Sequence, residues 1–136
     1  MADEFILFKD DRIKREWESG RLDPVVKFIV TEASEFAAAF LQWPLTLACI
    51  WRTQGEDQKL KGTGVHPAYR AIDIRTRDQD PAVVACLVSY LNGKYIYDPS
   101  RPTKVVAYSK PHGTGPHCHI QSFPNRTTLR MTPRET

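Results

Sequence analysis

The 136-residue chain lacks any long hydrophobic run. No stretch approaches the ~20 consecutive apolar residues that a membrane-spanning helix requires, so the sequence predicts no membrane span. The apolar stretch at residues 5–8 is too short for a signal peptide, and acidic rather than basic residues precede it. We therefore expect a protein that is made in the cytoplasm without a signal peptide.

The chain also lacks a strong excess of charge of one sign and a set of cysteines spaced for disulfide bonds. Its 19 Lys and Arg residues oppose 16 Asp and Glu residues, and the resulting net charge of +3 is too small to argue for nucleic-acid binding. Three cysteines at wide spacing, Cys49, Cys86 and Cys118, form a poor disulfide framework and indicate a reducing compartment. With 41% hydrophobic and 26% charged residues, we expect one globular domain over residues 1–136, with a polar C-terminal tail from about residue 127.

Apolar periodicity and turn residues predict the secondary structure. Asp-Pro pairs at 23–24 and 80–81 are typical of helix starts, and Asn92-Gly93 is typical of a left-handed helix end. The polar segment 53–64, with three glycines, predicts a loop. We expect helices over residues 11–19, 23–43 and 80–93, and strands over residues 45–51, 69–75, 95–97, 104–109 and 118–123. This order favours an α+β fold in which a small antiparallel sheet packs against two or three helices.

Two short motifs hold three of the four histidines and suggest a metal site. The first runs from His66 to Asp73, and the second is His117-Cys118-His119. Zinc binds imidazole and carboxylate groups, and catalytic zinc sites typically use three protein ligands and leave a fourth position for water. Residues two apart on a strand share a face, so both histidines of the second motif would point the same way while Cys118 points to the core. His66 can join Asp73 only from the loop before the strand, where Pro67 favours an extended residue.

Each of these features also has a simpler explanation. A His-x-His motif alone is common by chance, and two surface histidines on a strand explain it equally well. Arg52, directly after an apolar strand, is consistent with a solvated strand end. Beside a metal, however, its guanidinium could bind a substrate carboxylate or stabilise an oxyanion.

Taken together, the motifs resemble those of the M15 group of zinc peptidases. The resemblance runs from about residue 45 to 120 and comprises Trp51-Arg52-Thr53 after a strand, His-x6-Asp containing Arg-Ala-x-Asp, and a C-terminal His-x-His. It implies the fold shared by D-alanyl-D-alanine peptidases and the hedgehog signalling domain. It also implies that His66, Asp73 and His119 bind Zn²⁺, that Arg52 holds the substrate or polarises its carbonyl, and that His117 lies beside the metal.

The chain departs from the family pattern at several positions. Many members have Ser and Gly where this chain has Gly64 and Tyr69. The carboxylate that serves some members as the base would fall at Pro116, so the base would have to be His117, His112 or another carboxylate. An imidazole suits this role, because its pKa near 6.5 lets it accept a proton at neutral pH.

The resemblance implies a zinc-dependent peptidase that hydrolyses bacterial cell-wall (peptidoglycan) peptides by metal-activated water. The missing carboxylate leaves two alternatives open: a catalytically inactive, zinc-stabilised binding module, or a metal-free phage structural component of the same fold. The peptide bond that is cleaved and the oligomeric state stay open, with a monomer as the simplest expectation. A protein without a signal peptide would reach the cell wall by release from the cell or on a virion.

Overall fold

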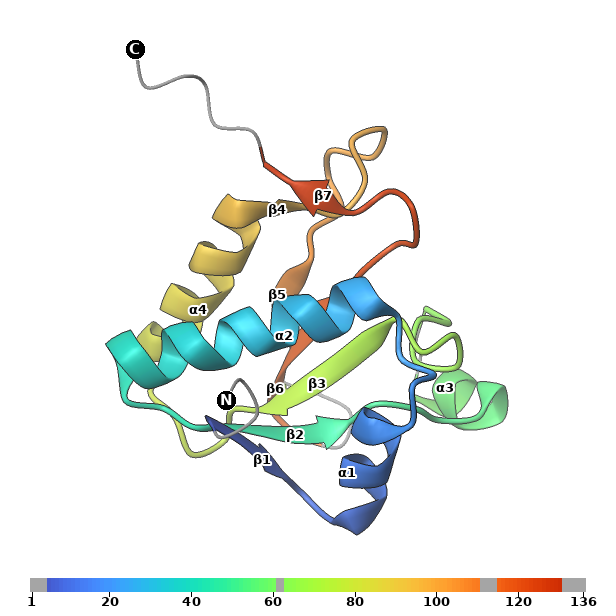
Figure 1. The fold of residues 1–136 in the computed structure, drawn as a ribbon, viewed down its shortest axis with the longest axis horizontal. Helices are drawn as coiled ribbons and strands as arrows, with labels where there is room; N and C mark the ends of the chain where they lie inside the picture. The colour runs from blue at the N-terminus through green and yellow to red at the C-terminus, as the bar shows by residue number, and fades with distance from the viewer. Residues whose placement is uncertain (1–4, 61–62, 111–114, 131–136) are drawn as a thin grey trace.

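The computed structural model describes residues 5–60, 63–110 and 115–130, and it has the predicted α+β architecture (Figure 1). The helices are α1 (Asp11–Glu18), α2 (Pro24–Phe36) with a π-helical continuation (Ala37–Leu41), α3 (Gln54–Lys59) and α4 (Pro81–Lys94). The strands are β1 (Ile6–Phe8), β2 (Leu45–Cys49), β3 (Ala71–Arg75), β4 (Tyr95–Ile96), β5 (Ala107–Lys110), β6 (His117–Gln121) and β7 (Thr128–Leu129). His112 and residues 131–136 of the expected tail lie outside the described residues.

A five-stranded sheet in the order β1-β2-β3-β6-β5 forms the centre of the fold. The pairs β2–β3, β3–β6 and β5–β6 are antiparallel, but β1 runs parallel to β2. The sheet is therefore mixed, and the expectation of a purely antiparallel sheet is wrong at this edge. A parallel neighbour requires a crossover connection, which α1 and α2 provide between β1 and β2.

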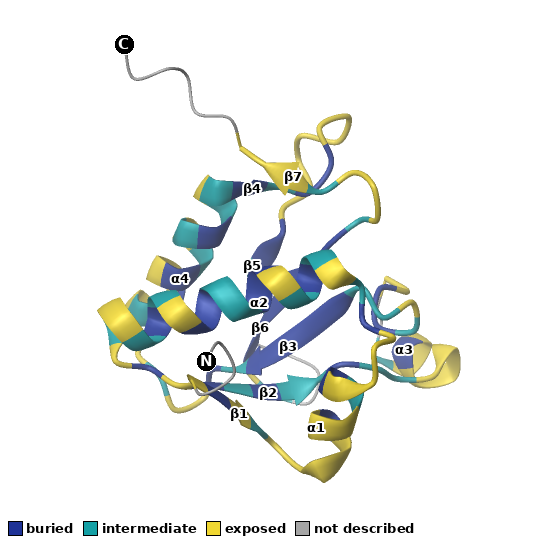
Figure 2. Cartoon of the chain, in the orientation of Figure 1, coloured by how far each residue is buried: buried dark blue, intermediate teal, exposed yellow. Residues whose placement is uncertain are grey.

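Helices α2 and α4 cover one face of the sheet (Figure 1). The periodicity that predicted α2 is confirmed, because Val26, Ile29 and Val30 have no exposed surface. The side chains of Ile72 and Ile120, from neighbouring central strands, are equally inaccessible and belong to the same core. Figure 2 shows the burial concentrated in β3 and on the sheet-facing side of α2. The opposite face of β3 and β6 is left for the polar residues of the candidate site.

Two local expectations are wrong because side-chain hydrogen bonds decide the structure. The expected loop 53–64 contains α3, since Thr53 and Glu56 form a reciprocal capping box that satisfies the first free N–H groups. Helix α4 does not end at Asn92-Gly93 as expected but continues to Lys94. The Asn92 amide instead donates to the Ala107 carbonyl and accepts from the Ala107 N–H, which ties α4 to the edge strand β5.

Both ends of the described chain add strands that the sequence analysis did not predict. Residues 6–8 form β1, and residues 128–129 form β7, which pairs with β4 in a separate two-stranded sheet. The start of the expected tail is thus ordered. Asp23 precedes α2 as expected, but its carboxylate accepts a hydrogen bond from the Ser122 hydroxyl instead of capping the helix. No helix in the described part of the chain is long and apolar enough to cross a membrane.

Candidate metal centre

The pairing of β3 with β6 brings both motifs onto one face of the sheet. Asp73 lies directly opposite His119, and Arg75 lies opposite His117. Directly opposed residues of antiparallel strands share a face, so the carboxylate and both imidazoles project to the side away from the helices. Cys118 lies in the core, with no exposed surface, as its alternate position predicted.

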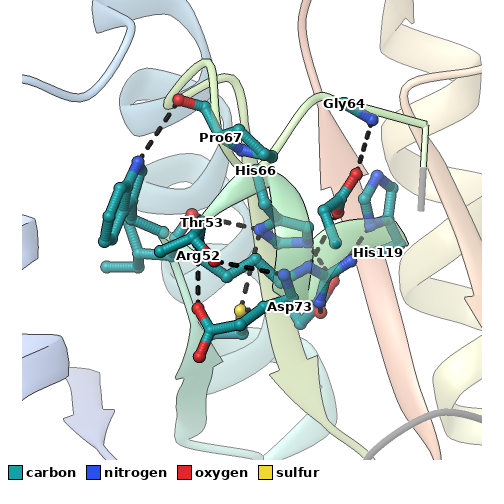
Figure 3. A network of polar contacts seen from close by, with 12 residues as sticks. Arg52, Thr53, Gly64, His66, Pro67, Asp73 and His119 are labelled. Carbon is teal, nitrogen blue, oxygen red and sulfur yellow. Dashed lines mark hydrogen bonds and ion pairs between the residues drawn. The ribbon is translucent and has the colours of Figure 1, made fainter. Parts of the chain in front are cut away.

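His66 reaches the same place from the loop before β3, as expected. The loop is a hydrogen-bonded turn in which the Tyr69 N–H donates to the His66 carbonyl and the Arg70 N–H donates to the Val65 carbonyl. Tyr69 has a φ of 57°, a left-handed conformation that tightens the turn. The Trp51 indole N–H also donates to the Pro67 carbonyl and anchors the turn to the end of β2 (Figure 3). His66 is completely buried.

One oxygen of Asp73 lies between the two predicted histidine ligands. Asp73 Oδ1 is 3.2 Å from His66 Nε2 and 2.9 Å from His119 Nδ1. Among the described residues, His66 Nε2 is buried without a hydrogen-bond partner, although it lies 3.2 Å from Asp73 Oδ1. The structure therefore brings together the three residues that the sequence predicted as zinc ligands (Figure 3).

The outer nitrogen of each of these imidazoles faces an oxygen acceptor. His66 Nδ1 is 3.0 Å from the Ile50 carbonyl, and His119 Nε2 is 3.1 Å from Gln121 Oε1. The Gln121 amide is oriented by the hydrogen bond that its N–H donates to the Val105 carbonyl. When both imidazoles are neutral, each carries one N–H, which its outer oxygen accepts, and the lone pairs of His66 Nε2 and His119 Nδ1 then point toward Asp73. This arrangement is typical of histidines that bind a metal.

The electrostatics of the cluster favour a positive charge between these groups. Burial raises the pKa of Asp73, but its contacts with His119 and His66 outweigh that effect and hold it far below the ordinary range. Burial lowers the pKa of His66, yet the neighbouring Asp73 carboxylate raises it to about 10. For His119, burial dominates and lowers the pKa, which keeps this imidazole neutral and able to donate a lone pair.

Cys49 is a neighbour of the site that the sequence analysis did not identify. Potential ligand atoms of Cys49, His66 and Asp73 lie within 4.8 Å of one another. Strict alternation along β2 would place Cys49 on the core side with Leu47. An irregularity in the β2–β3 register pairs Leu47 with Ile74 but Cys49 with Asp73, and so turns the thiol to the site. No sequence signal marks this bulge.

Arg52 lies at the edge of the cluster and is held in place. Its Nε donates to Asp57 Oδ1 at 2.7 Å, and Asp57 Oδ2 accepts from the Gly64 N–H. One terminal nitrogen of Arg52 lies 4.0 Å from Asp73 Oδ2. The side chain is 12% exposed, so it is a largely covered, oriented guanidinium and not a solvated strand end. Helix α3, absent from the sequence prediction, supplies the orienting carboxylate.

His117 borders the cluster on the other side of Asp73. Its Nδ1 is 2.7 Å from the Gly115 carbonyl, which accepts the N–H, and its Nε2 is 3.6 Å from Asp73 Oδ2. Among the described residues, Asp73 is the carboxylate that contacts all three of these histidines.

Tyr108 stacks on His119 with a ring separation of 4.9 Å. Gln121 and Tyr108 were not identified from the sequence, although Gln121 continues the alternation of His117 and His119.

Comparison of the chain with protein-family models, with curated proteins and with solved structures found no match. The interpretation of the site therefore depends on its own residues and geometry.

Proposed function

We propose that this protein is a zinc-dependent peptidase that hydrolyses peptides of the bacterial cell wall. One observation carries the proposal: His66 Nε2 and His119 Nδ1 converge on the same oxygen of Asp73 while their outer nitrogens are held by oxygen acceptors. Cell-wall peptide as the substrate comes from the resemblance of the two motifs to M15 peptidases.

The residues fit a zinc ion. His66 Nε2 is a buried nitrogen without a hydrogen-bond partner in the described chain, and the convergent donor set is two imidazoles and one carboxylate. This set is one that catalytic zinc sites use. When bound, zinc polarises a carbonyl oxygen and lowers the pKa of a water ligand to about 7.

His117 is suited to move the proton. The Gly115 carbonyl fixes its Nδ1 as the N–H, so its Nε2 carries the lone pair and faces the site beside Asp73. It would accept a proton from the attacking water and return it to the leaving amine. Its side chain is 10% exposed, so the imidazole lies at the boundary between the buried cluster and solvent.

Arg52 is suited to hold the substrate. Asp57 fixes its Nε, and its terminal nitrogen Nη1 lies near both Cys49 Sγ and Asp73 Oδ2. Because the Asp57 carboxylate already orients this guanidinium, the Arg52 side chain loses little conformational entropy when it binds a substrate carboxylate or a developing oxyanion. Arg52 would therefore position the scissile carbonyl without itself exchanging a proton.

Zinc content and hydrolysis, measured on the same samples, test the proposal. We expect about one zinc per chain in the wild type and release of a new amine from muropeptides. His66→Ala and His119→Ala should lose both zinc and activity, whereas His117→Ala should keep zinc and lose activity. One zinc per chain in both ligand variants, or full activity in His117→Ala, would contradict the assignment.

A second candidate is a zinc-stabilised binding module without hydrolysis. Pro116 occupies the position of the carboxylate base of the resembled family, and this observation favours the module. Binding of muropeptides at full zinc occupancy, without a new amine, would support the module over the peptidase.

A further inference from the structure

A cavity of about 290 Å³ opens beside the candidate metal centre and has a strongly basic wall. Asp73 and His117 form its inner end, and Lys9, Arg75 and Arg77 contribute positive charge around it. Arg75 lies on β3 two residues after Asp73 and opposite His117, so its side chain projects on the face of the site. The Lys9 N–H donates to the Leu47 carbonyl, which fixes the backbone of Lys9 beside β2.

Within the described part of the chain, these three cations have no acidic partner. Among residues 5–60, 63–110 and 115–130, none of Lys9, Arg75 and Arg77 lies within ion-pair distance of a carboxylate. Among the described residues that line the cavity, Asp73 is the one carboxylate, and its oxygens face His66 and His119 on one side and His117 on the other. The cavity therefore presents uncompensated positive charge next to the candidate catalytic residues, which favours an anionic group.

A second cavity, also of about 290 Å³, has a different character. It shares Lys9 and Ala48 with the basic cavity and reaches the site at Cys49 and Arg52. Its walls combine the apolar side chains Ile13, Trp51 and Leu60 with charged residues of both signs, among them Asp10 and Glu56. The cavity that borders His117 therefore differs from this one in having charged residues of mainly one sign.

We propose that the cavity bounded by Lys9, Arg75 and Arg77 binds a carboxylate of the substrate, and that the protein therefore selects peptides with a free carboxylate on one side of the reacting bond. This inference rests on the proposed function and adds the substrate class. Arginine binds a carboxylate in a bidentate manner, and two arginines with a lysine provide more donors than one carboxylate needs. A peptide whose carboxylates are converted to amides would lose these charge-assisted hydrogen bonds.

The test measures how the zinc-loaded full chain hydrolyses two forms of one peptide. The peptide is the cell-wall stem L-Ala-D-Glu-L-Lys-D-Ala-D-Ala, used as the free acid and with every carboxylate amidated. We expect KM for the free acid to be about tenfold lower than for the amidated form, as the loss of charged hydrogen bonds implies. The double variant Arg75→Gln/Arg77→Gln should remove this difference, and Arg75→Lys/Arg77→Lys should retain part of it. Arg15→Gln, an exposed change on α1, is the control and should not alter it.

The outcomes separate this inference from the proposed function. Equal KM values for the two peptides, unchanged in the double glutamine variant, would overturn the carboxylate subsite while hydrolysis itself still supports a peptidase. If neither peptide is hydrolysed, binding of each is followed by NMR chemical-shift titration. Preferential binding of the free acid that the double glutamine variant abolishes would support the subsite even though the peptidase proposal fails. Equal binding would reject the subsite.

Discussion

Replacement of Asp73 by asparagine tests the metal centre most directly. Asp73→Asn keeps the shape of the side chain but removes the carboxylate whose Oδ1 lies 3.2 Å from His66 Nε2 and 2.9 Å from His119 Nδ1. Because zinc would bind only the folded site, added zinc should stabilise the wild type by about 2.7 kcal/mol at 100 times its dissociation constant. For a domain of this size one kcal/mol corresponds to roughly 4 °C, so the unfolding midpoint should rise by about 10 °C. The variant should show no such rise.

Differential scanning fluorimetry with and without zinc, after removal of metal by a chelator, measures this effect. Asp57→Asn is the matched control, because Asp57 is equally buried but contacts Arg52 and Gly64 instead of the histidines. It should lower the midpoint of the zinc-free protein and keep the zinc-dependent rise. The reasoning fails if Asp73→Asn shows the same rise as the wild type with one zinc per chain.

Three further substitutions test the supporting structure. Gln121→Leu removes the oxygen that accepts a hydrogen bond from His119. We therefore expect the affinity for zinc, measured by competitive chelator titration, to fall by about 10- to 100-fold. An unchanged affinity would refute the role of this amide. Asn92→Ala removes both hydrogen bonds to Ala107, and the free energy of unfolding measured in urea should fall by about 1–3 kcal/mol. A decrease below about 0.5 kcal/mol would show that these hydrogen bonds do not hold α4 against β5. Burial raises the pKa of Glu32, but hydrogen bonds from Lys94 and Tyr95 outweigh this effect and lower the pKa below its ordinary value. The Glu32 carboxylate therefore stabilises the fold at pH values above its pKa in the unfolded chain. This stabilisation is lost as the pH falls through its pKa in the folded protein. The stability advantage of wild type over Glu32→Gln should therefore shrink between pH 7 and pH 3 in urea titrations, and a constant advantage would contradict it.

Periodicity predicted the elements whose burial is regular. The apolar spacing of α2 reflects its one buried face, and the alternation of β3 separates Ile72 and Ile74 in the apolar core from Asp73 on the face of the candidate site; both elements appear where they were expected. The two-residue spacing of His117 and His119 likewise placed both imidazoles on one face. Short elements were missed because their stability comes from partners far away in the chain. Strand β1 depends on pairing with β2, and β7 depends on pairing with β4.

At the candidate site, the sequence determined the residue types and the face to which each strand directs them. It placed His66 on a loop, Asp73 on a strand and His119 on another strand, and the structure brings these three together. Only the tertiary structure decided that they converge on one carboxylate oxygen, because that depends on the β3–β6 register and on the turn anchored by Trp51.

The tertiary structure also decided what surrounds the three residues. The β2 bulge turned Cys49 toward the site, α3 oriented Arg52 through Asp57, and the strand ends placed Lys9, Arg75 and Arg77 around one cavity. The β2 bulge and the cavity join residues that are distant in sequence, and Arg52 meets Asp57 only because residues 54–59 form the capped helix α3. The sequence by itself therefore determined an α+β chain whose histidines and aspartate suit a metal site, and the register of its strands decided the geometry of that candidate site.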